Sequence, residues 1–250
     1  MKALVTGASR GIGRAVANAL LAADAHVALA VRDLASVAQL TASAKAIALG
    51  VDLRRADQTE VLVERAVSAL GGLDVLVNCA GIVHYNPLGQ VSRAELMEQL
   101  EVNFVAPFLL GQRAAVHMRS AGAGGAIVNV ASTLGLRAAA QTAAYAASKA
   151  ALISLTESLA LEFGRDRVRV NAVAPGVIDT DMVRVARPGP DSSAQATAST
   201  LEAQLAELRE LHLMRRLGTP EEVAEAVLYL LRAEFVTGTV LVVDGGLLLG

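Results

Sequence analysis

The stretch that decides the fold class is Ala3-Leu4-Val5-Thr6-Gly7-Ala8-Ser9-Arg10-Gly11-Ile12-Gly13. A short apolar strand leads directly into a glycine-rich turn, and a helical pattern follows over residues 12–22. Glycines at such a junction permit a tight turn and let a pyrophosphate approach backbone N–H groups at a helix N-terminus. The spacing is Gly-x-x-x-Gly-x-Gly, not the Gly-x-Gly-x-x-Gly of the general dinucleotide fingerprint. The junction indicates phosphate binding, although a tight turn without a ligand would use the same glycines.

The rest of the chain repeats this alternation of strand and helix. Apolar runs typical of buried strands lie at residues 3–6, 27–31, 46–51, 75–77, 127–130, 168–173 and 240–243. Helical patterns lie at residues 12–22, 60–70, 94–118, 144–163 and 220–231. Such alternation predicts a parallel sheet with helices on both faces. Because no linker divides the chain, we expect residues 1–250 to form one domain, with the Pro/Gly-containing residues 187–193 as an insertion within it.

Composition excludes several classes of function. Hydrophobic residues make up 54% of the 250 residues and aromatic residues only 3%, so the core must be aliphatic. The net charge of −2 gives no basic footprint for nucleic acid. No apolar run reaches membrane-spanning length, and the first strand leaves no room for a signal peptide, so we expect a soluble cytoplasmic protein. The single cysteine excludes an internal disulfide, and four scattered histidines predict no metal site.

A second pattern points to proton chemistry. Tyr145 and Lys149 are four residues apart, and Tyr145 follows Ser132 by thirteen residues. On a helix, positions i and i+4 share a face, so the phenol and the ammonium should point into one cleft. A nearby positive charge stabilises a phenolate and lowers the tyrosine pKa toward neutral pH. An ordinary surface helix can carry the same pair, and only the rest of the chain favours the catalytic interpretation.

The end of the second predicted strand bears on the choice of dinucleotide. An acidic residue there would bind the adenosine ribose and repel a 2′-phosphate. This chain has Arg32 at that position, and Arg10 lies in the glycine turn. Two guanidinium groups that converge suit a phosphate dianion, which predicts NADP(H) over NAD(H). Asp33 complicates the prediction because it could offset Arg32 or bind the ribose itself.

Taken together, these motifs resemble the short-chain dehydrogenase/reductase family over essentially the whole chain. The matching positions are residues 6–13, Asp52, Asn78-Cys79-Ala80-Gly81, Asn103, Ser132, Tyr145-x-x-x-Lys149, Asn171, Pro175-Gly176 and Thr180. Cys79 stands where the family usually has asparagine. The resemblance implies a doubly wound Rossmann-type domain with a seven-stranded parallel sheet. It also implies a homotetramer or homodimer, in which the long helical segments 94–118 and 144–163 pair across a two-fold axis.

The resemblance further implies roles for individual residues. Asn103, Ser132, Tyr145 and Lys149 would be catalytic: Ser132 orients the substrate carbonyl, Tyr145 exchanges the proton, Lys149 lowers the tyrosine pKa, and Asn103 holds a kinked helix and a relay water. Asp52 would bind the adenine and residues 175–180 would cover the nicotinamide. The full set implied for the cofactor is Gly7, Ser9, Arg10, Gly11, Ile12, Gly13, Arg32, Asp52, Leu53, Asn78, Ala80, Gly81, Tyr145, Lys149, Pro175, Gly176, Ile178 and Thr180.

The substrate is less sharply indicated. Residues 170–176 and 242–246 resemble the 3-oxoacyl-[acyl-carrier-protein] reductase branch, so we expect reduction of a 3-oxoacyl thioester or related ketone. Residues 181–218 should form a substrate lid, in which Leu201, Leu205, Leu208 and Leu211 either pack in the core or line the substrate. A carrier protein would require a basic entrance, for which Arg113, Arg119, Arg165 and Arg167 are candidates.

Two alternatives remain open at this stage. The longer lid also resembles NAD-dependent dehydrogenases of cyclic dihydrodiols or other secondary alcohols. A non-catalytic dinucleotide-binding redox sensor is an alternative of another class, which the intact Ser132, Tyr145 and Lys149 oppose.

Overall fold

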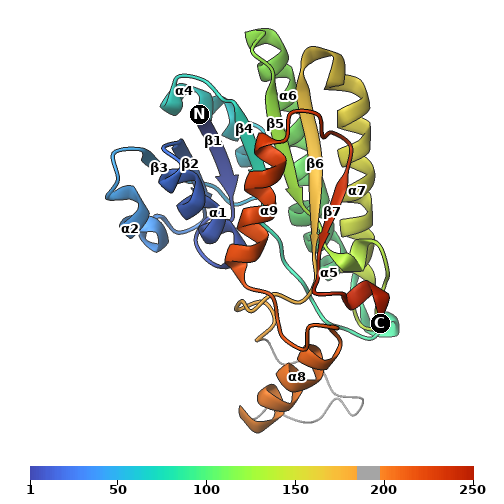
Figure 1. Ribbon diagram of the computed structural model, residues 1–250. Coiled ribbons are helices and arrows are strands. Elements are labelled where there is room, and N and C mark those ends of the chain that lie inside the picture. Colours follow the sequence, from blue (N-terminus) through green and yellow to red (C-terminus); the bar gives the residue numbers. More distant parts are fainter. Residues whose placement is uncertain (185–197) are drawn as a thin grey trace.

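The fold is that of a computed structural model, in which residues 1–184 and 198–250 are described. Seven strands form one parallel sheet in the order β3-β2-β1-β4-β5-β6-β7 (Figure 1). Their bounds are β1 (Lys2–Thr6), β2 (His26–Val31), β3 (Ala46–Gly50), β4 (Val75–Asn78), β5 (Gly125–Val130), β6 (Val168–Pro175) and β7 (Val240–Val243). All seven predicted strands are therefore confirmed within a few residues. The strand order reverses between β1 and β4, where open α/β sheets form a ligand-binding crevice at the carboxyl ends.

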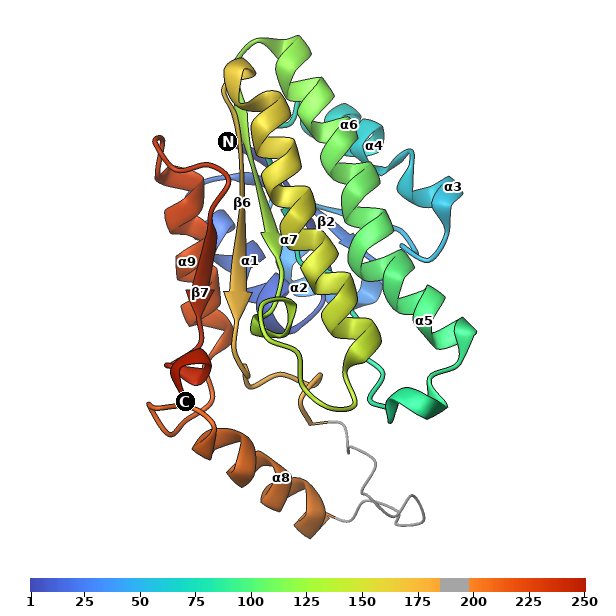
Figure 2. The same ribbon diagram turned by 90° about the vertical axis from the view of Figure 1, so that its right-hand side faces the viewer.

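Helices cover both faces of the sheet (Figures 1 and 2). One face carries α1 (Gly11–Ala22), α2 (Ala38–Thr41) and α9 (Pro220–Arg232), and the other carries α3 (Ala56–Thr59), α4 (Leu62–Leu70), α5 (Arg93–Leu100), α6 (Ala106–Ala121) and α7 (Ala143–Phe163). Within β1, Ala3 and Val5 pack toward α1 and α9, whereas Leu4 packs toward the other layer. Both sides of the strands are thus buried in aliphatic cores, as their uninterrupted apolar sequences predict.

The predicted helix over residues 94–118 is interrupted. α5 and α6 are joined by a π-helical turn at Glu101–Val105, and Pro107 lies in the first turn of α6. Proline has no N–H to continue the i→i−4 ladder, so a break just before it is favourable. Wider turns of this kind occur mostly at functional sites. Asn103, one of the candidate catalytic residues, lies in this turn.

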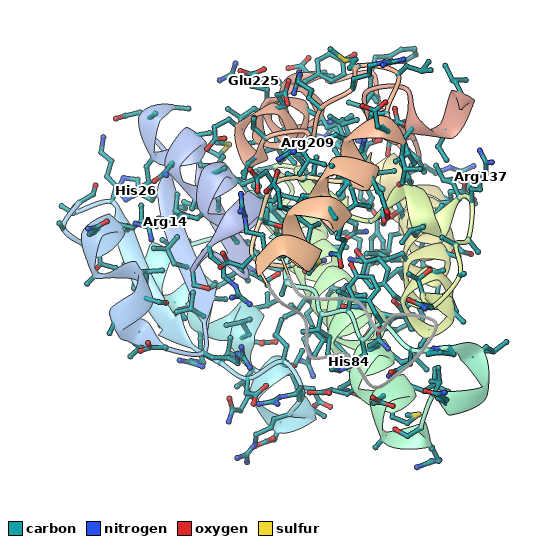
Figure 3. The ribbon with its side chains drawn as sticks, turned by 90° about the horizontal axis from the view of Figure 1, so that it is seen from below. Arg14, His26, His84, Arg137, Arg209 and Glu225 are labelled. Atoms are coloured by element: carbon teal, nitrogen blue, oxygen red, sulfur yellow. The ribbon has the colours of Figure 1, made fainter. Side chains whose placement is uncertain are left out.

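The described part of the segment predicted as a lid, residues 181–184 and 198–218, lies at the carboxyl edge of the sheet. α8 (Ala198–Glu210) extends below that edge in Figure 1, and Figure 3 shows it with Arg209 labelled. Leu205 and Leu208 are buried with Val183, which favours core packing for the leucine stripe, while Leu211 is exposed. The predicted insertion at residues 187–193 lies outside the described residues. Among the described residues, we find no helix with the length and apolar character needed to span a membrane.

Candidate active site

A cleft opens at the carboxyl ends of the strands, beside the reversal of strand order. It is lined by Gly7, Ser9, Arg10, Gly11, Ile12, Gly13, Arg32, Asp52, Leu53, Ala80, Gly81 and Thr180, all of which the sequence nominated for the cofactor. The lining also includes Arg54, Glu98 and Val102, which sequence reasoning missed, and Asp181 and Met182, which it assigned to the substrate lid. Asp181 and Met182 follow directly on the nominated Thr180. The others come from helix α5, its π-helical extension and a surface turn, for which no motif gives a signal.

The glycine turn fits an anion. A side chain on Gly13 would collide with the Gly7 carbonyl oxygen, and one on Gly7, where φ is +68°, would lie 2.8 Å from the Ala80 Cα. Helix α1 begins at Gly11 without a side-chain cap and without an acidic residue in its first turn. By contrast, α9 begins with a capping box formed by Thr219 and Glu222. The N–H groups at the start of α1 are therefore left for a ligand, as a pyrophosphate requires.

The strands on either side of the reversal are tied together by Thr6. Its Oγ1 accepts hydrogen bonds from the N–H groups of Cys79 and Ala80, at 3.0 and 3.1 Å. The Asn78 side chain turns inward, away from the cleft, and donates to Asn129 Oδ1 at 2.9 Å. Its own Oδ1 has no hydrogen-bond partner among the described residues. Of the residues nominated at the end of β4, Ala80 and Gly81 line the cleft, whereas Asn78 is buried and is not among the described residues that line it.

Asp52 is held by an arginine that the sequence analysis did not single out. Arg54 donates from Nη2 to Asp52 Oδ2 at 2.6 Å and from Nε to Oδ1 at 2.9 Å, and this contact keeps the Asp52 pKa below its usual value. Arg54 also reaches Glu98, which in turn bonds His84 Nε2 at 2.9 Å. The Glu98 pKa is lowered by His84 and by Arg54. An adenine that binds Asp52 must therefore share the carboxylate with a guanidinium group.

The two arginines nominated for a 2′-phosphate are both exposed on the cleft wall. Arg10 pairs with Asp181 at 3.3 Å, so this arginine links the glycine turn to the start of the predicted lid. Arg32 lines the cleft, and its charge contributes to the lowered Asp52 pKa. Asp33 turns back and accepts a hydrogen bond from the Ala35 N–H at 3.0 Å. Its carboxylate is thus engaged in capping its own chain rather than in pairing with Arg32.

The three residues of the Ser–Tyr–Lys pattern are buried together beyond the glycine turn. Ser132 follows β5, and Tyr145 and Lys149 lie one turn apart on α7, with exposed fractions of 8%, 9% and 3%. The Ser132 hydroxyl is close enough to the Tyr145 phenol to lower the pKa of that phenol, and it also accepts a hydrogen bond from the Leu134 N–H at 3.1 Å. The Lys149 Nζ lies 5.7 Å from the centre of the Tyr145 ring. The structure thus brings together the residues that sequence spacing predicted to share a cleft.

The expected lowering of the Tyr145 pKa is not found in the protein alone. Burial raises the pKa of Tyr145, and the neighbouring Ser132 hydroxyl offsets only part of that rise. Lys149 donates from Nζ to the Val130 carbonyl at 2.8 Å, and burial lowers its own pKa to about 8. The expected lowering fails because Tyr145 and Lys149 are both buried, and desolvation disfavours the charged form of each side chain.

Asn103 is fully buried in the π-helical turn. Its Oδ1 accepts from the Ile82 N–H at 2.9 Å, and its Nδ2 donates to the Ile82 carbonyl at 2.9 Å and to Ser148 Oγ at 3.1 Å. Ser148 in turn donates to the Tyr145 carbonyl at 2.7 Å. Asn103 therefore fixes the segment after β4 against the helix that carries Tyr145.

The segment nominated for the nicotinamide follows β6. Thr133 donates to the Pro175 carbonyl at 3.2 Å, Gly176 donates to the Val243 carbonyl at 2.9 Å, and the Thr180 hydroxyl lies 3.3 Å from the Ile178 carbonyl. Cys79 lines the cleft, and burial raises its thiol pKa to about 12, which makes it unreactive. Among the described residues there is no cluster of side chains that could hold a metal ion.

Comparison with known proteins agrees with this geometry. The family model described as Enoyl-(Acyl carrier protein) reductase matches residues 7–248. Cis-4-hydroxycyclohexanecarboxylate dehydrogenase of Sinomonas cyclohexanicum is 38% identical over 98% of this chain and 95% of its own length. The 3-oxoacyl-[acyl-carrier-protein] reductase of Mus musculus is 35% identical over 97% of this chain and 96% of its own. A crystal structure of a short-chain type dehydrogenase/reductase from Mycobacterium marinum superimposes with a TM-score of 0.86, at 32% identity over 98% of this chain and 94% of that one.

These similarities run the length of the chain and include both the glycine turn and the Ser–Tyr–Lys set. Members of the family bind NAD(H) or NADP(H). The chain belongs to the short-chain dehydrogenase/reductase family and is an oxidoreductase that acts on a carbonyl or alcohol group.

Proposed function

We propose that the protein is an NADP(H)-dependent reductase that converts a ketone, either a 3-oxoacyl thioester or a related carbonyl, to a secondary alcohol. The observation that carries the proposal is one candidate active site with two unlike ends. Ser132, Tyr145 and Lys149 are buried at one end, where a Cβ added to the cleft residue Gly81 would lie 3.6 Å from Lys149 Nζ. Arg10 and Arg32 are exposed on the cleft wall at the other end. The first set suits proton transfer to a carbonyl oxygen, and the second suits a phosphate dianion.

The protein's own groups would act as follows. When bound, the dinucleotide supplies or accepts a hydride. Ser132 donates a hydrogen bond to the substrate oxygen and orients it. Tyr145, which is protonated at neutral pH because burial raises its pKa, gives its proton to that oxygen. Lys149 holds the nicotinamide ribose and Asn103 fixes the helix geometry. Alcohol oxidation would use the same groups in reverse.

The preference for NADP(H) draws support from Asp33. A carboxylate aimed into the cleft at the end of β2 would repel a 2′-phosphate. Asp33 instead caps the following turn, and Arg32 is left on the cleft wall. We therefore propose that Arg32 binds the 2′-phosphate and that Arg10 joins it by exchanging its pair with Asp181.

Delivery by a carrier protein is disfavoured by the positions of the candidate arginines. Arg119 is in the last turn of α6, and Arg165 and Arg167 precede β6, so all three lie at the amino edge of the sheet, opposite the cleft. Arg113 is paired with Glu60 and Glu64 at 3.4 and 3.1 Å. An acidic carrier would meet no basic entrance made by these residues, which favours a free small molecule as substrate.

A second candidate is the NAD-dependent oxidation of a cyclic secondary alcohol. It is favoured by the 38% identity with a dehydrogenase named for a hydroxycyclohexanecarboxylate. The redox-sensor alternative has no comparable support, because Ser132, Tyr145 and Lys149 are all present and buried next to the cleft. The proposal also includes one domain over residues 1–250 with a lid at about 181–218, a homotetramer or homodimer, and a cytoplasmic location.

Turnover with both dinucleotides tests the proposal. Purified protein would be assayed with NADPH and NADH against acetoacetyl thioesters and cyclic and open-chain ketones, and with NADP⁺ and NAD⁺ against the matching alcohols. Reduction of a ketone with NADPH supports the proposal. Activity confined to NAD⁺ and cyclic alcohols would favour the second candidate, and binding of either dinucleotide without turnover would favour the sensor.

A further inference from the structure

His212 lies at a junction of three segments near the proposed nicotinamide site. It follows α8, and its side chain is buried, with only 2% of the residue exposed. A Cβ added to Gly176 would lie 3.1 Å from His212 Nε2, and one added to Gly245 would lie 3.6 Å from its Cδ2. The imidazole therefore packs between the end of α8, the loop after β6 and the turn after β7.

Both ring nitrogens are engaged by backbone groups of opposite kind. Nδ1 lies 2.8 Å from the Leu208 carbonyl, and Nε2 lies 3.2 Å from the Val177 nitrogen. A carbonyl can only accept, so Nδ1 must carry the proton; the Val177 N–H can only donate, so Nε2 must be unprotonated. The two contacts together select one neutral tautomer.

The Val177 contact completes the anchoring of a short stretch of backbone. The Val177 carbonyl accepts from the Gly218 N–H at 3.0 Å, and the Asp179 N–H donates to the Gly218 carbonyl at 2.9 Å. Between these contacts lies Ile178, which forms an isolated bridge with Gly218. Gly218 thus holds one side of the loop, and His212 holds the peptide N–H immediately before Ile178.

We propose that His212 is a positioning residue that fixes the backbone of residues 175–180 and ties it to helix α8. This inference rests on the proposed function, in which Ile178 meets the nicotinamide through its backbone. By fixing the Val177 peptide, His212 sets the orientation of the next peptide group without touching the cofactor. The other ring nitrogen, Nδ1, binds the Leu208 carbonyl of α8, the helix of the proposed lid. A shift of α8 would therefore move the same loop.

Three substitutions separate the two contacts. His212→Gln places a side-chain oxygen near the position of Nε2 and keeps an acceptor for Val177. His212→Asn keeps only a donor near the position of Nδ1, and His212→Phe keeps only the ring volume. His26→Gln, at an exposed position at the start of β2, is the matched control.

The readout compares a whole cofactor with its fragment. The Kd of NADPH and of 2′,5′-ADP, which lacks the nicotinamide, would be measured for each variant, together with kcat for a ketone. We expect His212→Phe and His212→Asn to weaken NADPH binding or lower kcat roughly tenfold, the equivalent of one hydrogen bond, with 2′,5′-ADP binding unchanged. His212→Gln should recover most of the loss, and His26→Gln should match the wild type.

Two results would overturn the inference. One is an equal loss of NADPH and 2′,5′-ADP binding in all three variants, including a failure to fold, because His212 would then support the whole domain. The other is a glutamine variant no better than phenylalanine. A wild-type protein that neither binds NADPH nor reduces a ketone with it would instead overturn the proposed function, and the two failures are distinguishable before any variant is made.

Discussion

The two ends of the candidate active site are built by opposite means. At the catalytic end, Tyr145 and Lys149 are at most 9% exposed, and Lys149 is fixed by its hydrogen bond to the Val130 carbonyl. At the adenosine end, the Arg10 side chain is 69% exposed, and its contact is an ion pair that a ligand can exchange. Desolvation dominates at the first end, and solvent-screened charge dominates at the second. The chemistry is therefore set by buried geometry, whereas the choice of cofactor is set by exposed side chains that single substitutions can alter.

The largest effect is expected when the Tyr145 hydroxyl is removed. Tyr145→Phe keeps the ring but deletes the group that donates the proton. We expect kcat to fall by roughly 10²–10⁴-fold, the usual contribution of general acid–base catalysis, while the Kd of the dinucleotide changes little. Steady-state kinetics and a fluorescence titration would measure both, and a variant that keeps most of its kcat would contradict the assignment of Tyr145.

Burial of Lys149 predicts a dependence of stability on pH. Its folded pKa of about 8 is below its ordinary value of 10.5, so between these values the unfolded chain binds the proton and the folded chain does not. The free energy of unfolding of the wild type should therefore rise with pH across this window, by an amount of order 1–3 kcal/mol.

Lys149→Met lacks that titration and serves as the reference. Urea denaturation of the two proteins at the lower and upper limits of the window would show the wild type gaining stability relative to the variant. If the free energies of unfolding of the two proteins changed equally with pH, Lys149 would not be desolvated in the folded state.

At the exposed end, the expected effects are smaller and selective. Arg32→Ala should weaken NADPH binding roughly tenfold and leave NADH binding almost unchanged, because one charge-assisted contact to a phosphate is lost. Arg55, which is exposed and pairs with Asp57 outside the cleft lining, provides the control substitution Arg55→Ala. Equal weakening of NADPH and NADH by Arg32→Ala would count against a 2′-phosphate site.

The smallest effect is expected from Glu98, which contacts both His84 and Arg54, the arginine that pairs with Asp52. Glu98→Gln weakens the link between Arg54 and His84 and frees Arg54 to compete more strongly for Asp52. We expect KM for both dinucleotides to rise by roughly two- to fivefold, as an exposed ion pair of modest worth permits, with kcat unchanged. Kinetics at low and high salt would check this, and a fall in kcat would place Glu98 in the catalytic machinery instead.

The same contrast explains what the sequence could predict. The buried elements have strong local signals: the apolar runs predicted all seven strands, and the i,i+4 spacing predicted that Tyr145 and Lys149 lie close together on one helix. The π-helical turn at Glu101–Val105 lay hidden inside one continuous helical pattern. The family resemblance implied a kinked helix at Asn103, but the helical pattern itself gave no sign of the turn.

Contacts between segments far apart in the chain could not be predicted. Arg54 meets Glu98 across forty-four residues, and Val177 meets His212 across thirty-five, with no motif linking either pair. The direction of the Tyr145 pKa was predicted wrongly, because spacing suggests a neighbouring charge but does not reveal how deeply both groups are buried. Arg119, Arg165 and Arg167 were expected near the cleft entrance, but they lie at the amino edge of the sheet. The edge at which each of them lies follows from the direction of the neighbouring strand, which the residues themselves do not indicate.

The most direct test of the proposed function is the titration of the wild-type protein with NADPH and with NADH at low and at physiological salt. We predict that NADPH binds more tightly and that its advantage narrows as salt rises, because exposed guanidinium groups are screened. Tighter binding of NADH, with no effect of salt on the ratio of the two Kd values, would contradict the proposal. The NAD-dependent oxidation of a secondary alcohol would then be the favoured function.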